Sequence, residues 1–177
     1  NLYAYGKEDN QKWIIVDLGV TFADDSIPGI DLIMPDPGFI IDKKDGLLGI
    51  VLTHAHEDHI GAVAHIWPEL KCKLYATPFT AALISEKFKE KKIDISSYLK
   101  IVPLNSKIKL GDFEIDFVTL THSILEPNGL SIKTPLGTIL HTGDWKIDPN
   151  PLIGNKIDVE KLKKIGNNGV DAMICDS

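Results

Sequence analysis

The chain has 177 residues, a formal net charge of −6 and an apolar content of 44%. This length predicts one domain with a core of its own, and the apolar runs are too short for a membrane span, so we expect no membrane partner. The acidic balance argues against a broad basic face for nucleic acid. The two cysteines, Cys72 and Cys175, lie far apart and exclude a disulfide framework, which predicts a reduced cytoplasmic protein with both thiols in its core.

Both ends of the chain are unusual for a complete domain. The sequence begins at Asn1 without the basic and then apolar leader of a signal peptide. It stops at Ser177, just after an apolar run. We therefore expect a piece of a longer protein.

The first half of the chain predicts alternating strands and helices. A stretch rich in proline and glycine, 28–38, predicts a loop, and residues 60–67 predict a helix that ends near Pro68. Thr77 and Pro78 have the residue types of an N-cap and a first helical position, so a second helix is expected to begin there. Short apolar runs predict strands at 13–16, 47–53 and 73–76.

The second half predicts antiparallel hairpins. A turn at 111–112 begins with glycine, which favours type II′, and a second hairpin turns at 135–137. A helix is expected at 159–165 with Gly166 as its stop, followed by a strand at 171–175. Hairpins mixed with helices predict an α/β layered sandwich rather than a doubly wound parallel sheet.

Three histidines and two acids crowd into six residues directly after a predicted buried strand. His54 and His56 are two apart, and residues with this spacing at an extended strand end lie on one side, so both imidazoles can reach one cation. Asp58 and His59 follow where the chain turns into a helix, and they can reach a second cation. Half of the chain's six histidines lie in this hexapeptide, which is not expected of unrelated loop residues.

Two later residues follow apolar strands at their C-terminal ends. His122 comes after the run 117–120, and Asp144 comes after 139–142. Strands of one sheet that deliver side chains at the same end would build a single site, and a carboxylate such as Asp144 can bridge two cations. Imidazole and carboxylate ligands suit zinc, manganese or iron. Two such cations suit hydrolysis of an ester, an amide or a phosphodiester.

The segment 54–59 resembles the His-x-His-x-Asp-His motif of the metallo-β-lactamase superfamily, and His122 and Asp144 match its next two ligand motifs. Asp17 matches the first motif of that superfamily, an acid that braces the metal-binding loop. The resemblance implies an αββα sandwich with mixed sheets and antiparallel hairpins. It also implies two divalent metal ions. His54, His56 and His122 would hold the first ion, Asp58 and His59 would hold the second, and Asp144 would bridge them.

Within this superfamily the chain is similar to the ribonuclease J family of the β-CASP branch. The similar stretches are 17–22, 52–62, 121–124 and 141–146, and 175–177 resembles the acidic motif before the β-CASP domain. Residues 1–177 would then form a partial metallo-β-lactamase domain that lacks its first strand and its C-terminal part. A β-CASP domain would follow residue 177, and a histidine from beyond this chain would complete the second metal site.

The resemblance to ribonuclease J implies 5′-to-3′ exonuclease and endonuclease cleavage of single-stranded RNA in the cytoplasm, by a homo-oligomer or within an RNA-processing complex. Two metal ions, expected to be Zn2+ with Mn2+ as the alternative, would share a hydroxide that attacks the scissile phosphorus. Two alternatives stay open. One is a small-molecule hydrolase of the same fold that acts on a thioester, a lactone or a β-lactam, and the other is an inactive fragment that only binds metal.

Further residues are expected around the ligands. Asp17, His141 and Asp176 are expected to support the site from behind, because metal-bound histidines commonly donate their other ring N–H to a carboxylate or a carbonyl. Ser123 is a candidate for a phosphate contact. His65 has no partner at a ligand spacing and is expected to be a structural or surface residue.

Overall fold

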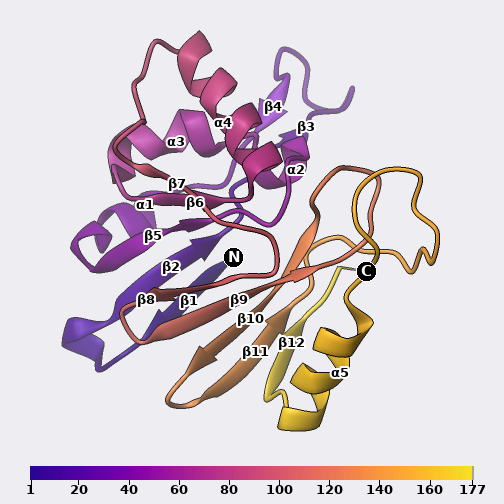
Figure 1. Cartoon of the computed structure of the whole chain (residues 1–177). Helices are drawn as coiled ribbons and strands as arrows, with labels where there is room; N and C mark the ends of the chain where they lie inside the picture. The colour runs from indigo at the N-terminus through magenta and orange to yellow at the C-terminus, as the bar shows by residue number, and fades with distance from the viewer. Residues whose placement is uncertain (177) are drawn as a thin grey trace.

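The computed structural model describes residues 1–176 and contains two five-stranded sheets that pack against each other (Figure 1). The first sheet has the order β1-β2-β5-β6-β7, with β1 antiparallel to β2 and the other neighbours parallel. Its strands are β1 (Leu2–Tyr5), β2 (Lys12–Val16), β5 (Leu47–Val51), β6 (Leu74–Ala76) and β7 (Leu99–Ile101).

The second sheet has the order β12-β11-β10-β9-β8 and is antiparallel except for the pair β11–β12. The turn between β8 and β9 contains Gly111 with a φ of 58°, the positive value that the predicted type II′ turn requires. The mixed sheets and the hairpins confirm the predicted α/β sandwich. The strands are β8 (Lys107–Leu110), β9 (Phe113–Thr119), β10 (Asn128–Thr134), β11 (Gly137–His141) and β12 (Ala172–Ile174).

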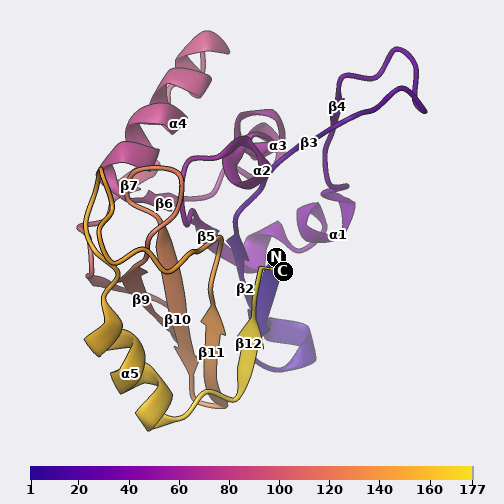
Figure 2. The same ribbon diagram turned by 90° about the vertical axis from the view of Figure 1, so that its right-hand side faces the viewer.

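Helices lie on the outer sides of the two sheets. Figure 1 shows α3 and α4 on the outer side of the first sheet and α5 beside the second sheet. A small two-stranded ribbon of β3 and β4 projects from the body of the molecule in Figure 2. Within residues 1–176, no helix combines the length and the apolar character needed to cross a membrane. The bounds are β3 (Thr21–Phe22), β4 (Leu32–Ile33), α1 (Gly38–Ile41), α2 (Glu57–Ile60), α3 (Val63–Leu70), α4 (Pro78–Glu90) and α5 (Val159–Asn168), with short 3-10 turns η1 (Glu8–Asn10) and η2 (Lys44–Gly46).

Two apolar cores hold the layers together. Between the sheets, Ile14 and Val16 of β2 belong to the same buried cluster as Phe117 of β9 and Leu130 of β10, and all four side chains are fully buried. Ile15 points to the other face of β2, where it joins the core beneath the helices. Alternation along β2 therefore lets one strand contribute to both cores.

The strands that precede the predicted ligands end at one end of the sandwich, but they belong to two sheets. β9 and β11 are both antiparallel to β10, so their C-terminal ends lie at the same edge of the second sheet. β5 lies in the first sheet, between β2 and β6. The expectation that one sheet delivers all the ligands is therefore wrong. The connections from β8 to β11 are hairpins, which keep these strands in an antiparallel sheet of their own.

The predicted end of the helix near Pro68 is also wrong, because α3 continues to Leu70. Its last turn buries Trp67 and Leu70, and the indole Nε1 of Trp67 donates a hydrogen bond to the carbonyl of Cys72 at 2.8 Å. These contacts compensate for the backbone hydrogen bond that a proline cannot donate.

Three further expectations need correction. α5 continues through Gly166 and ends at Asn168, and the capping residue Gly169 has a φ of 90° that suits a helix stop. The predicted loop 28–38 contains β4, which is held by its pairing with β3. Cys72 is buried as expected, but Cys175 is exposed because it follows the edge strand β12.

Replacing Gly166 by Ala is expected to stabilise the chain by about 0.5–1 kcal/mol, because the residue is helical and nothing lies within 4 Å of an added Cβ. The matched Gly169→Ala variant is expected to lose about 1 kcal/mol, since its φ of 90° disfavours a residue with a Cβ. Urea denaturation measures both free energies of unfolding. A stabilised Gly169→Ala variant would contradict the helix end at this residue.

Candidate metal centre

The histidine-rich segment leaves the first sheet at the end of β5 and turns into α2. Thr53 and His54 are completely buried, whereas His56 is partly buried. The backbone at His56 is extended, with φ −70° and ψ 153°, and the helix begins at the next residue. Nε2 of His54 lies 3.1 Å from Nδ1 of His56, so the two rings point to one side as their spacing predicted.

Three imidazoles and one carboxylate form a first group of donors. Nε2 of His122, which follows β9, lies 3.2 Å from Nδ1 of His56 and 3.5 Å from Oδ2 of Asp144. The same oxygen of Asp144 lies 3.9 Å from Nε2 of His54. One donor atom from each of these four residues lies within 4.8 Å of the others. Four donors around one point is the number that a tetrahedral metal ion requires.

Asp144 also belongs to a second group of donors. Its Oδ1 lies 3.0 Å from Nε2 of His59, and Oδ2 of Asp58 lies 3.7 Å from the same nitrogen. The donor atoms of these three residues again lie within 4.8 Å of one another. The two oxygens of Asp144 therefore face two different groups, as those of a bridging carboxylate would. The side chain of Asp58 is 65% exposed, so the second group is open to solvent.

A buried carboxylate orients two of the histidines. Asp17 follows β2, and its Oδ2 accepts hydrogen bonds from Nδ1 of His59 and from the hydroxyl of Thr53, both at 2.7 Å. Its Oδ1 accepts the backbone N–H of Thr53 at 2.8 Å. The Thr53 hydroxyl donates its proton to Asp17 and lies 3.0 Å from Nδ1 of His54, from which it accepts. The Nε2 atom of His54 is left with a lone pair that faces the site, and the Nε2 atom of His59 has one when that ring is neutral.

The pKa values follow from burial and from this carboxylate. Burial, helped by the charge of His59, lowers the pKa of His54 to about 3, so this imidazole is neutral at pH 7. Burial also acts to lower the pKa of His59, but the hydrogen bond and charge of Asp17, with the charges of Asp144 and Asp58, raise it to about 8. Burial acts to raise the pKa of Asp17, but its hydrogen bonds and the charge of His59 outweigh burial and lower it. Asp17 is thus an anion at neutral pH.

The segment after β2 lies directly against the ligand candidates. The N–H of Leu18 donates to the carbonyl of His59 at 2.7 Å. A Cβ on Gly19 would sit 1.7 Å from the carbonyl oxygen of Asp58, so the approach of these two backbones requires glycine. The placement of Asp58 and His59 therefore depends on a neighbour without a side chain.

His141 is buried at the end of β11, where it bridges the two sheets. Its Nδ1 lies 2.7 Å from the hydroxyl of Tyr3 in β1. Burial lowers the pKa of His141, and burial with the charge of Asp17 raises the pKa of Tyr3 to about 12, so the phenol keeps its proton. Sequence reasoning did not find Tyr3, because nothing in its own segment indicates a partner 138 residues away.

The remaining predicted residues lie outside the two donor groups. Asp176 is exposed, and its backbone N–H donates to the hydroxyl of Thr142 at 3.3 Å, but its carboxylate joins neither group within residues 1–176. Ser123 is exposed beside the first group. His65 is exposed on α3, with Nδ1 3.3 Å from Nζ of Lys91, in agreement with the predicted surface role.

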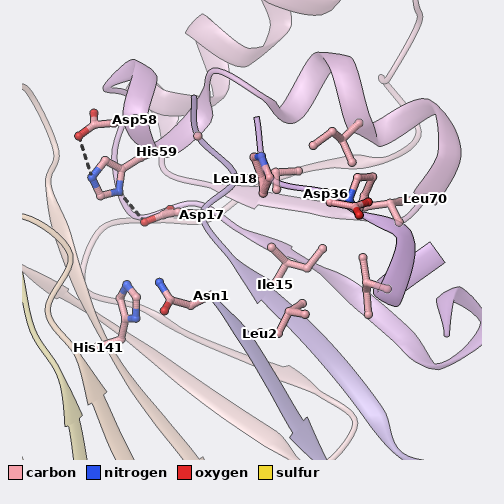
Figure 3. Close-up of a pocket in the computed structure, with 15 residues that line it drawn as sticks. Asn1, Leu2, Ile15, Asp17, Leu18, Asp36, Asp58, His59, Leu70 and His141 are labelled. Carbon is pink, nitrogen blue, oxygen red and sulfur yellow. Dashed lines mark hydrogen bonds and ion pairs between the residues drawn. The ribbon is translucent and has the colours of Figure 1, made fainter. Parts of the chain in front are cut away.

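A cavity of about 280 Å3 lies beside the second group (Figure 3). Asp17, Asp58, His59 and His141 line one side of it, and apolar side chains such as Leu70 line the other. His54 does not line this cavity. The cavity therefore gives access to Asp58 and His59 of the second group, whereas His54 of the first group stays buried away from it.

The chemistry of the donors fits divalent metal ions. The first group offers three imidazole nitrogens and one carboxylate oxygen, a set without thiolates that is typical of catalytic zinc or manganese rather than of closed structural zinc. The second group offers one nitrogen and two carboxylates, and no other donor of the described chain joins it. The ligand roles of these six residues stay predictions.

The Asp17→Asn variant is expected to lower the pKa of His59, because it removes the charge that holds this value at about 8. In the metal-free chain, the contribution of His59 to stability is complete below its ordinary pKa of 6.5 and is lost as the pH rises through about 8. NMR titration of the imidazole signals measures the pKa, with the exposed His65 as the internal control. Urea denaturation across that pH range should show the loss in the wild type and a smaller one in Asp17→Asn. An unchanged pKa of His59 in the variant would contradict the assigned ion pair.

The chain has sequence relatives among known proteins. Ribonuclease J of Sinorhizobium meliloti is 43% identical over 176 residues, which are 99% of this chain and 31% of that protein. Ribonuclease J of Helicobacter pylori strain J99 is 41% identical over 93% of this chain and 24% of its own. Ribonuclease J2 of Bacillus subtilis is 34% identical over 100% of this chain and 32% of its own. The chain thus spans a quarter to a third of the length of these relatives.

Solved structures and a family model agree on the fold. Zn(2+)-bound PqqB from Methylobacterium extorquens superposes with a TM-score of 0.53 at 13% identity, over 80% of this chain and 48% of that one. The metallo-beta-lactamase fold protein YhfI from Bacillus subtilis gives a TM-score of 0.54 at 17% identity, over 81% and 54%. The model of the beta-lactamase superfamily domain matches residues 12–162. As the motif at 54–59 implied, the chain belongs to the beta-lactamase superfamily.

Proposed function

We propose that this chain carries the two-metal centre of a ribonuclease. The observation that carries the proposal is the position of Asp144, whose two carboxylate oxygens face two separate groups of donors. When bound, two divalent ions would polarise a phosphodiester and lower the pKa of a water molecule at the site. The first ion would be held by His54, His56, His122 and Asp144, and the second by Asp58, His59 and Asp144.

The chain's own residues prepare this site in three ways. Asp17 keeps a proton on Nδ1 of His54 and of His59, so that Nε2 is the nitrogen of each ring that faces the site. His54 offers this lone pair at neutral pH, whereas His59, with a pKa of about 8, would release a proton when a metal ion binds. Asp144 holds the two groups at a fixed separation. Asp58 leaves the second group open to solvent, where a phosphate can approach. The local positive charge of two cations is compatible with a chain of net charge −6.

The relatives support RNA as the substrate class. Over almost the whole of this chain, proteins named ribonuclease J or J2 are 34–43% identical to it. We propose cleavage of single-stranded RNA, both from the 5′ end and internally, with Zn2+ as the ions and Mn2+ as the alternative. We also propose a cytoplasmic protein that acts as a homo-oligomer or in an RNA-processing complex. The partial metallo-β-lactamase domain over 1–177 and the β-CASP domain after it stay predictions.

The His56→Ala and Asp144→Ala variants are expected to lose bound metal and RNA cleavage together, each by more than about 100-fold, since each removes a donor from the first group. The matched control is His65→Ala, which removes an exposed histidine outside both groups. Metal content is measured by atomic absorption after dialysis. Cleavage is measured on a labelled single-stranded oligoribonucleotide.

Full RNA cleavage by a metal-depleted variant would reject the proposal. Hydrolysis of a β-lactam, a lactone or a thioester by the wild type, without RNA cleavage, would favour the small-molecule enzyme instead. A wild type that binds metal and cleaves none of these substrates would favour the fragment that only binds metal.

A further inference from the structure

One buried side chain joins the two sheets next to the ligand candidates. Asn128 is the first residue of β10 and is 1% exposed. Its Nδ2 donates to the carbonyl of Thr53 at 3.1 Å and to the carbonyl of Glu126 at 2.6 Å. Its backbone N–H also donates to the carbonyl of Thr53, at 3.2 Å. Thr53 immediately precedes His54, so these bonds end on the backbone that presents the first ligand candidate.

The backbone that presents Asp144 packs at the same place. Gly143 has a φ of 57°, and a Cβ on it would lie 3.2 Å from the carbonyl oxygen of Asn128 and 3.3 Å from Cβ of Thr53. A side chain at Gly143 would be crowded by both neighbours and strained by the positive φ. The segments before His54 and before Asp144 therefore meet at Asn128, although they belong to different sheets.

The loop from His122 to Asn128 is held at a second point. Oε2 of Glu126 accepts the backbone N–H of Phe79 at 2.8 Å, in the first turn of α4. Thr77 occupies the N-cap position as predicted, but its hydroxyl makes no hydrogen bond within residues 1–176. Glu126 thus takes over the capping of this helix. The loop that follows His122 is tied to the helix layer by Glu126 and to the segment just after β5 by Asn128.

We propose that Asn128 is a positioning residue for the metal centre. Its amide sets the spacing between the donors from the first sheet and those from the second: His54, His56, His122 and Asp144. An amide suits this role because it donates two hydrogen bonds to carbonyls of two segments, which neither a carboxylate nor an apolar side chain can do. Its Oδ1 is buried without a partner in the described part of the chain, so Asn128 holds these segments together through the N–H groups of its side chain and backbone. The inference rests on the proposed metal centre but not on RNA as the substrate.

The test compares two substitutions at this site with one in the core. Asn128→Ala removes both donors, and Asn128→Asp places carboxylate oxygens against the carbonyls of Thr53 and Glu126. The control is Ile115→Val, which loosens the fully buried inter-sheet core within β9, seven residues before His122. The Kd for Zn2+ is measured on the full chain by competition with a chromophoric chelator. The d–d absorption spectrum of the Co2+-loaded chain reports the geometry of the site.

Both Asn128 variants are expected to raise the Kd for Zn2+ by about 10–100-fold and to change the Co2+ spectrum. Ile115→Val is expected to lower the unfolding midpoint and leave the Kd and the spectrum as in the wild type. If Asn128→Ala does not fold at the assay temperature, the Kd and the Co2+ spectrum are measured on Asn128→Ser, which keeps one donor. Folded Asn128 variants with the Kd and the Co2+ spectrum of the wild type would overturn the inference. A wild type that binds Zn2+ but does not cleave RNA would overturn the ribonuclease proposal and leave this one standing.

Discussion

Asp17 is an anion in a position that is only 9% exposed, and three hydrogen bonds from His59 and Thr53 make this burial tolerable. The same bonds decide which ring nitrogen of His59 carries the proton and, through the Thr53 hydroxyl, do the same for His54. One carboxylate therefore directs an Nε2 atom into each of the two donor groups. The backbone contact at Gly19 then holds the second group against the segment that follows Asp17. The orientation of His54 and His59 thus depends on Asp17.

The second determinant is the topology of the chain. The ligand candidates follow the C-terminal ends of β5 in the parallel part of one sheet and of β9 and β11 in an antiparallel sheet. Neither sheet contains a complete set of donors. The groups exist only because the two sheets pack through the core that includes Val16 and Phe117 and because their ends meet at Asn128. Asp144 lies at this meeting point, with one oxygen toward each group.

Local patterns account for what could be predicted from the sequence. The spacing of His54 and His56 determines that they share a side of an extended segment, and the strands before His122 and Asp144 are apparent from their apolar runs. The two-sheet origin of the site was not predictable in this way, because an apolar run indicates a strand but not the sheet to which it belongs. Tyr3 and Asn128 could not be found either, since their partners lie 138 and 75 residues away. The helix through Pro68 shows burial of Trp67 outweighing a local preference.

A site built from two sheets has a mechanical consequence for the whole sandwich. A cation that binds His54 and His56 on one side and His122 and Asp144 on the other would act as a cross-link between the layers. Folding and metal loading would then be a single linked equilibrium, worth about 2.7 kcal/mol when free metal is a hundred times its Kd. Chelation would weaken the sandwich at the end where the ligand candidates meet, so the free energy of unfolding would depend on the free metal concentration around the chain.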